Sequence, residues 1–349
     1  MRILYAIQGT GNGHIARAED IIPVLQEYGK LDIFVSGAQA DIKLDYHVQY
    51  KSKGLSFYFG KSGGVDLIKT FGKNSARNVY NEIKAFPVEK YDVVINDFEP
   101  ITAWACLHKK IPCVGLSHQS ALLSPLTPRP TSYDPVGDWI IRNYAPVRNH
   151  VGFHFDNFDN NIFTPVVRRR IREANAMDKG HYTVYLPAYD DRKLLPILNK
   201  FPSIRWHVFS KHSHRPYHIG KISVYPVNNE EFTASMTTAT GVLCGAGFET
   251  PAEALHLRKR LLVVPMKGQY EQHYNAAALK QMGVPVIRKL KKKSLKRIQE
   301  WLDTKSSVKV KYRDVAPDAV GRAMALAENR NYNDSVMISL SINDRNLFI

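Results

Sequence analysis

The sequence predicts an α/β protein of two domains, each built around a mostly parallel β-sheet. Apolar runs with strand character alternate with helical patterns along most of the chain. Several of these runs end in glycine-rich or polar loops, as the strands of a parallel sheet do at the edge where ligands bind. The chain of 349 residues is long enough for two such domains, and its hydrophobic content of 44% suffices for two cores.

The first half opens with a strand, a glycine-rich loop, a helix and a second strand. The strands are expected over residues 3–7 and 31–35, and the helix over residues 15–28. The loop over residues 8–14 carries alternating glycines instead of the Gly-X-Gly-X-X-Gly spacing of dinucleotide-binding proteins. No acidic residue ends the second strand, so NAD binding is not expected.

The rest of the first half continues the alternation. Strands are expected over residues 48–50, 55–59, 91–95, 112–116 and 151–155, and helices over residues 65–86 and 101–109. Most of the stretch from residue 121 to residue 163 is irregular and rich in aromatic residues and prolines.

Three residues of this half stand where strands end. His14 follows the first strand, Asp97 follows the strand over residues 91–95, and His118 follows the strand over residues 112–116. The carboxyl ends of parallel strands share one edge of the sheet, so we expect these side chains to lie near one another. His14 and Asp97 each have the alternative role of capping the start of a helix.

The second half repeats the pattern. Strands are expected over residues 182–186, 205–209, 222–225, 240–244 and 261–264, and helices over residues 192–200, 228–236 and 316–329, with two more beginning near residues 251 and 275. We therefore expect an N-terminal domain of residues 1–165 and a C-terminal domain of residues 166–330. Residues 331–349 form an extension to which the sequence assigns no place.

The glycine turn after residue 244 organises the second half. Gly245 and Gly247 follow a strand directly and precede a helix that has Pro251 near its first turn. Such a helix presents unpaired N–H groups and the positive end of its dipole, so a phosphate group fits there. The same sheet edge gathers further polar residues, namely Glu253, Gln269, Glu271, Gln272 and Asn275. Alternatively, Glu253 is only a partner of the helix dipole in the first turn, and Glu271 and Gln272 belong to a solvated loop.

This stretch of 35 residues, 245–279, resembles a known signature. The pattern Gly-X-Gly-Phe-Glu-Thr-X-X-Glu-Ala-Leu, then Leu-Val-Val-Pro, then Gln-X-Glu-Gln-X-X-Asn-Ala is similar to the donor-binding region of GT-B glycosyltransferases. The resemblance points to the lipid-linked N-acetylglucosaminyltransferase of peptidoglycan synthesis and to the UDP-glycosyltransferases. It implies two Rossmann-like domains whose parallel sheets face an interdomain cleft, with the acceptor in the first domain and the nucleotide sugar in the second.

The resemblance also implies roles for individual residues. The glycine turn and its helix would hold the donor diphosphate, Glu253 the ribose diol, and Glu271 with Gln272 the hydroxyls of the donor sugar. The expected donor site comprises Gly11, Asn12, Gly13, Gly245, Gly247, Phe248, Thr250, Glu253, Gln269, Glu271, Gln272 and Asn275.

The reaction implied is inverting transfer of a sugar from a nucleotide sugar, most simply a UDP-sugar, to a hydroxyl acceptor. Gly-Asn-Gly-His14 is similar to the Gly-Gly-His loop of these families, so His14 is the expected general base. Asp97 matches the aspartate that orients this histidine in plant-type relatives, and Glu99 is its competitor. His118 is a candidate for acceptor contact. We expect no metal ion and no other cofactor, because a helix N-terminus can stabilise the leaving diphosphate and an Asp-X-Asp motif is missing.

Two other functions fit parts of the sequence. Gly11-Asn-Gly-His-Ile-Ala-Arg17 resembles the Gly-X-Gly-His-X-X-Arg loop of the nucleotide-sugar hydrolases of nonulosonate biosynthesis, in which the histidine would activate water. A non-catalytic nucleic-acid-binding protein is the third reading, supported only by the formal net charge of +16. Zinc-ligand spacing, RNP-like aromatic motifs and helix-turn-helix patterns are all missing, so nucleic acid is a weak candidate partner.

The charge fits an anionic membrane surface better. Basic runs at Arg168–Arg172 and Arg288–Arg297, together with the apolar segment Leu122–Leu126, suit a peripheral protein acting on a lipid-linked acceptor. A basic enzyme with a small hydrophilic acceptor is the alternative. The three cysteines lack paired spacing, and the chain begins with a strand instead of a signal peptide. We therefore expect a cytoplasmic protein that docks on the inner face of the cell membrane.

Overall fold

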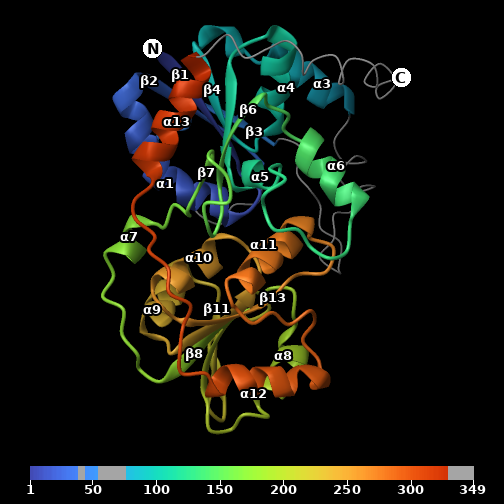
Figure 1. The fold of residues 1–349 in the computed structure, drawn as a ribbon, viewed down its shortest axis with the longest axis vertical. Helices are drawn as coiled ribbons and strands as arrows, with labels where there is room; N and C mark the ends of the chain where they lie inside the picture. The colour runs from blue at the N-terminus through green and yellow to red at the C-terminus, as the bar shows by residue number, and fades with distance from the viewer. Residues whose placement is uncertain (38–43, 54–75, 329–349) are drawn as a thin grey trace.

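The computed structural model describes residues 1–37, 44–53 and 76–328, which form two α/β halves stacked along the long axis of the molecule (Figure 1). Each half has a mostly parallel sheet, so the predicted fold class is confirmed. The strand expected over residues 55–59, the first part of the helix expected over residues 65–86 and the extension at residues 331–349 lie outside the described residues.

The first sheet has seven described strands, all parallel, in the order β3-β2-β1-β4-β5-β6-β7. They are β1 (Arg2–Gln8), β2 (Lys30–Ser36), β3 (Tyr50–Ser52), β4 (Val93–Asp97), β5 (Cys113–Ser117), β6 (Asn149–Phe153) and β7 (Ile162–Phe163). β1 pairs with β4 in the register that sets Ile7 opposite Asp97. The loop after β1 therefore begins beside the end of β4.

The described helices of this half are α1 (Asn12–Tyr28), α3 (Ala76–Ala85), the 3-10 turn η1 (Val88–Lys90), α4 (Pro100–Lys109), α5 (His118–Ala121) and α6 (Pro135–Asn143). α6 falls in a stretch predicted to be irregular, and that prediction is wrong for these residues. The start signal was present: the side chain of Asp134 accepts a hydrogen bond of 3.1 Å from the N–H of Gly137, and Pro135 takes the first helical position.

The second sheet has six described strands in the order β10-β11-β9-β8-β12-β13, parallel except for the β10–β11 hairpin. They are β8 (His181–Tyr185), β9 (Arg205–Ser210), β10 (Tyr217–Ile219), β11 (Ile222–Pro226), β12 (Gly241–Gly245) and β13 (Arg260–Val264). The helices are α7 (Arg169–Arg172), α8 (Asp191–Leu198), α9 (Asn229–Thr238), α10 (Glu249–His256), α11 (Tyr270–Gln281), the 3-10 turn η2 (Lys292–Ser294) and α12 (Leu295–Asp303). α10 and α11 lie on the side of this half that faces the first half (Figure 1).

The last described helix, α13 (Ala316–Glu328), returns to the first half and packs against α1, β5 and β6 (Figure 1). Its buried side is apolar and includes Ala319, Val320 and Ala323. On the way, the hydroxyl of Tyr312 donates a hydrogen bond of 2.8 Å to the carbonyl oxygen of Phe155. The range predicted for the second domain, residues 166–330, thus includes a helix that packs on the first sheet.

Candidate functional site

A cleft of about 510 Å³ opens between the two halves. Eight of the residues predicted for the site line it, namely Gly11, Gly13, His14, His118, Gly247, Phe248, Gln269 and Glu271. Residues that were not predicted also line it, among them Gln8, Arg17, Phe98, Gln119, Glu249 and the residues of α6 nearest its start. Among the described residues, Asn12, Asp97, Gly245, Thr250, Glu253, Gln272 and Asn275 stand outside this lining.

The loop after β1 brings His14 to the cleft. Gly11 precedes α1 with a φ of 101°, a left-handed conformation that favours glycine. His14 is then the third residue of α1, and its side chain is 12% exposed. Its Nδ1 lies 2.8 Å from Oδ1 of Asp97, the last residue of β4. The register of β1 and β4 is what brings these two residues together.

The Asp97 carboxylate is fully buried and is paired with the Arg17 guanidinium. Arg17 donates from Nη2 to both of its oxygens, at 2.8 and 2.9 Å. Burial alone would raise the pKa of Asp97, but the charge of Arg17 and the contacts with His14 hold that pKa below its ordinary value. Asp97 is therefore an anion at neutral pH, as stabilisation of a protonated His14 would require.

Glu99, the other candidate partner of His14, instead caps the start of α4. Its carboxylate accepts hydrogen bonds from the backbone N–H groups of Ile101 and Thr102, at 2.8 and 2.7 Å, and so caps α4. It also accepts a bond of 2.7 Å from the hydroxyl of Ser36. Of the two carboxylates considered as partners of His14, only Asp97 contacts it, and the capping role suggested for Asp97 belongs to Glu99.

Phe98, between these two acids, has a φ of 57°. A bulky residue in the left-handed region carries backbone strain, and such strain is concentrated at functional sites. Its ring packs against Tyr144, with 5.1 Å between ring centroids, and lines the cleft.

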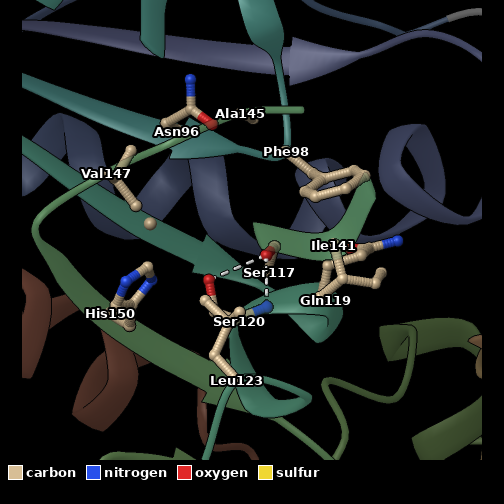
Figure 2. Close-up of a pocket in the computed structure, with 11 residues that line it drawn as sticks. Asn96, Phe98, Ser117, Gln119, Ser120, Leu123, Ile141, Ala145, Val147 and His150 are labelled. Atoms are coloured by element: carbon tan, nitrogen blue, oxygen red, sulfur yellow. Dashed lines mark hydrogen bonds between the residues drawn. The ribbon is translucent and has the colours of Figure 1, made fainter. Parts of the chain in front are cut away.

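A second cavity shares Phe98, Gln119 and Ile141 with the cleft (Figure 2). Figure 2 shows Ser117 beside Ser120 in its lining: the Ser117 hydroxyl lies 2.9 Å from that of Ser120 and accepts a bond of 3.0 Å from the Ser120 N–H. The cavity measures about 10 Å³, which is roughly the space of one water molecule. A sugar is therefore too large for this cavity, whereas the cleft has room for one.

The wall of the cleft that was predicted to bind the donor begins at the glycine turn between β12 and α10. Gly247 and Phe248 line the cleft, and Glu249, the first residue of α10, follows them. The Glu249 carboxylate reaches across the cleft to Arg17, with 3.0 Å between its Oε1 and Nη1. Arg17 thus joins the His14–Asp97 pair of one half to the first turn of α10 in the other.

Glu253, expected at the donor ribose, is paired with Arg168. The guanidinium donates from Nε to Oε1 and from Nη2 to Oε2, the second bond measuring 2.6 Å. Glu253 is 3% exposed and Arg168 is 8% exposed, so the pair is buried. Arg168 also donates from Nη1 to the Asn229 side chain, at 3.1 Å. The prediction that Arg168 belongs to a surface basic run is therefore wrong.

The loop after β13 is shorter than predicted, because α11 begins at Tyr270 instead of near residue 275, and its first turn is held in part by the first half. Glu271 accepts a hydrogen bond of 3.0 Å from Nε2 of Gln119, and burial raises the pKa of Glu271. Gln272 turns inward instead, accepting a bond of 2.9 Å from the N–H of Met266 and donating to the side chain of Gln269. Glu271 and Gln269 thus face the cleft, and Gln272 supports the loop.

His118 and Asn275 form another bridge between the halves. Nε2 of His118 lies 2.7 Å from Oδ1 of Asn275, and its Nδ1 lies 2.7 Å from the carbonyl oxygen of Phe153. The ring stacks on Phe248 with 3.9 Å between centroids and is only 1% exposed. Both ring nitrogens are thus engaged by protein atoms, so His118 as placed joins the two halves instead of presenting a nitrogen to an acceptor.

Three residues that shape the site, Gln119, Arg168 and Glu249, were not predicted to belong to it, and Arg17 was named only in the loop that resembles the nucleotide-sugar hydrolases. Arg17 had a local signal, because a residue three positions after His14 lies on the same face of a helix. The partners of Arg168 and Glu249 are 85 and 232 positions away in the sequence, and no local pattern indicates them.

Comparison with known proteins identifies the family and the fold. The model of glycosyl transferase family 1 matches residues 1–304. Similar solved structures include MurG of Acinetobacter baumannii (13% identity, 94% of this chain and 98% of that chain, TM-score 0.55) and UGT89C1 of Arabidopsis thaliana complexed with UDP (13%, 93% and 94%, 0.57). The glycotransferase of kitacinnamycin is also similar (13%, 94% and 95%, 0.55). No curated protein matches the sequence. The chain therefore belongs to glycosyl transferase family 1, and it is a glycosyltransferase with the GT-B fold.

Proposed function

We propose that the protein is an inverting glycosyltransferase that moves a sugar from a nucleoside diphosphate sugar to an acceptor hydroxyl, with His14 as general base. The observation that carries this is the His14–Asp97 contact of 2.8 Å beside a cleft whose opposite wall is the first turn of α10. A base and an anion-binding helix end that face each other across a sugar-sized cleft suit the displacement of a diphosphate.

The proton transfer follows from the contacts of His14. A neutral imidazole that donates from Nδ1 to Asp97 has an unprotonated Nε2 for the acceptor hydroxyl. The acceptor oxygen bonds to the anomeric carbon on the face opposite the diphosphate, and the bond from that carbon to the diphosphate oxygen breaks. The hydroxyl proton passes to Nε2, and the Asp97 anion stabilises the resulting imidazolium. One displacement inverts the configuration at the anomeric carbon.

The leaving diphosphate needs positive charge, and this chain supplies it without a metal ion. The first turn of α10 offers N–H groups and the positive end of its dipole. Arg17 adds a guanidinium from the facing wall of the cleft. UDP is the simplest donor nucleotide, in line with the UDP of the UGT89C1 structure, and thymidine diphosphate, found with the similar SsfS6, is the second candidate.

A thermal-shift screen of UDP-, TDP-, GDP- and CDP-sugars tests the proposal. A ligand that binds the folded state raises the melting temperature by mass action. We expect one nucleotide class to raise it, and the matching sugar nucleotide to be consumed only when an acceptor is supplied. A protein that no nucleoside diphosphate stabilises would contradict the proposal.

Hydrolysis of the nucleotide sugar is the second candidate function, and the position of Arg17 favours it. The arginine of the Gly-X-Gly-His-X-X-Arg loop lies 3.2 Å from Nδ1 of His14 and on both oxygens of Asp97, so the whole motif is assembled at the cleft. In that reaction water replaces the acceptor hydroxyl. Release of free sugar at the full catalytic rate without an acceptor separates hydrolysis from transfer.

The acceptor that we propose is lipid-linked and presented at an anionic membrane. Four apolar side chains in and before α6 are exposed, namely Leu126, Tyr133, Val136 and Trp139, and of these Val136 lines the cleft. Of the predicted apolar segment, however, Leu122 is buried against Ile141. The lysines Lys291–Lys293 are exposed, as expected for the second basic run. No helix in the described ranges combines the length and apolar character needed to cross a bilayer.

A further inference from the structure

The carboxylate of Glu249 lies where the two glycine-rich loops of the molecule meet. A Cβ added to Gly13 would lie 2.5 Å from Oε2 of Glu249, so the carboxylate rests directly on the first turn of α1. Glu249 is itself the first residue of α10. One carboxylate thus occupies the point at which the N-terminal turns of α1 and α10 come together.

Both helix starts are suited to binding an anion. The residues that precede the two helices, Gly11 and Phe248, make no side-chain capping hydrogen bond to them. The N–H groups of such a turn and the positive end of the helix dipole attract negative charge. Two helix ends directed at one place favour a group with more negative charge and more acceptor oxygens than a single carboxylate has.

Arg17 is the second, independent indication of a ligand here. Its side chain is 2% exposed and lines the cleft, and its Nε has no hydrogen-bond partner in the described part of the chain. Both oxygens of Asp97 hold its Nη2, and its Cζ lies 5.5 Å from the centre of the Phe153 ring. Arg17 is therefore fixed in place, while the Glu249 side chain is 29% exposed and has solvent beside it.

We propose that Glu249 occupies the diphosphate subsite of the ligand-free protein and that the donor diphosphate displaces it. Arg17 then exchanges the Glu249 carboxylate for a phosphate oxygen and keeps its contact with Asp97. Donor binding and the charge next to the His14 base are coupled through this one guanidinium. The inference deepens the proposed function and rests on it for the identity of the anion.

Inorganic pyrophosphate is the probe, because it needs no knowledge of the sugar or the base. Calorimetric titration is compared for the wild type, Glu249→Gln and Glu300→Gln. The last is a matched control that loses the same charge from the exposed side of α12. Removing the competing carboxylate should tighten pyrophosphate binding by roughly tenfold, the loss of about one charge-assisted hydrogen bond. Glu300→Gln should bind pyrophosphate with the same affinity as the wild type.

A second variant tests the role of Arg17. Arg17→Lys keeps the charge opposite Asp97 but lacks the planar fork, so in the Glu249→Gln background it should abolish most of the tenfold gain. Equal pyrophosphate affinities for the wild type and Glu249→Gln would overturn the inference, as would weaker binding to Glu249→Gln. If the wild type turns over a nucleotide sugar in those cases, the inference fails and the proposed function stands. The expected pyrophosphate response without any nucleotide-sugar binding would support the anion subsite and contradict the proposed function.

Discussion

Arg168 binds both carboxylate oxygens of Glu253 through a buried guanidinium. Arg168 belongs to the connection between the two sheets, whereas Glu253 lies on α10 in the second half. The residue expected to bind ribose therefore also anchors the connection, and the two roles can be separated by experiment.

Glu253→Ala should destabilise the protein by about 3–5 kcal/mol, because it leaves the Arg168 charge buried without its partner. It should also raise the donor dissociation constant by roughly tenfold if the carboxylate accepts the ribose hydroxyls. Urea unfolding and donor titration measure the two effects. Arg168→Ala is the control: it should cost similar stability, and an equal loss of donor affinity in that variant would assign Glu253 a structural role only.

His14→Ala should lower turnover by about 10²–10⁴-fold, since it removes the group that takes the acceptor proton. Donor affinity should stay within a few-fold of the wild type. Single-turnover kinetics and donor titration measure these quantities separately. Near-normal turnover in the folded variant would place the base elsewhere.

Lowering the pH should reduce the free energy of unfolding, and buried His118 should account for part of this loss. Burial lowers the pKa of His118 to about 4, from an ordinary value near 6.5. Below about pH 6.5 the unfolded chain binds a proton that the folded chain does not, so this stabilisation is complete above pH 6.5 and is lost as pH falls toward 4. His118→Gln should make the free energy of unfolding less dependent on pH between these limits. An unchanged pH slope in a folded variant would show that His118 is protonated in both states.

Substitutions of Phe98 test whether the backbone is strained at this position. Phe98→Gly and Phe98→Ala both remove the ring, but glycine adopts a φ of 57° without steric cost. The glycine variant should therefore be more stable than the alanine variant by about 1 kcal/mol. Paired urea denaturation curves measure the difference, and an alanine variant as stable as the glycine variant would argue against strain at this position.

Liposome flotation tests the membrane proposal. The protein should bind anionic vesicles, and binding should weaken as salt rises because exposed charges are screened. Changing Lys291, Lys292 and Lys293 to Gln should reduce binding, since each basic residue near an anionic surface contributes about 1 kcal/mol. The same change at Lys305, Lys309 and Lys311, also exposed, is the charge-matched control. A lack of binding to anionic vesicles at low salt would contradict the membrane proposal and support a small hydrophilic acceptor.

The sequence by itself determined the alternation of strands and helices, the glycine turns and the residues at strand ends. These are local features: periodicity and glycine placement act within a few residues. Gly11 and His14 were therefore correctly expected after a strand of the first sheet, and Gly247 after a strand of the second. The N-terminal cap of α4 is a local feature too, but either Asp97 or Glu99 could have provided it from the sequence. Only the packed structure assigns it to Glu99.

The tertiary structure alone decided which charges meet. Arg17 reaches Glu249 and Arg168 reaches Glu253 because the two halves close on each other and the connection folds back along α10. α13 packs on the first sheet for a similar reason: its apolar face is buried there by α1, β5 and β6. A buried ion pair forms only where packed parts of the protein exclude water from both charged side chains. That depends on how the two halves assemble, and no local sequence pattern contains this information.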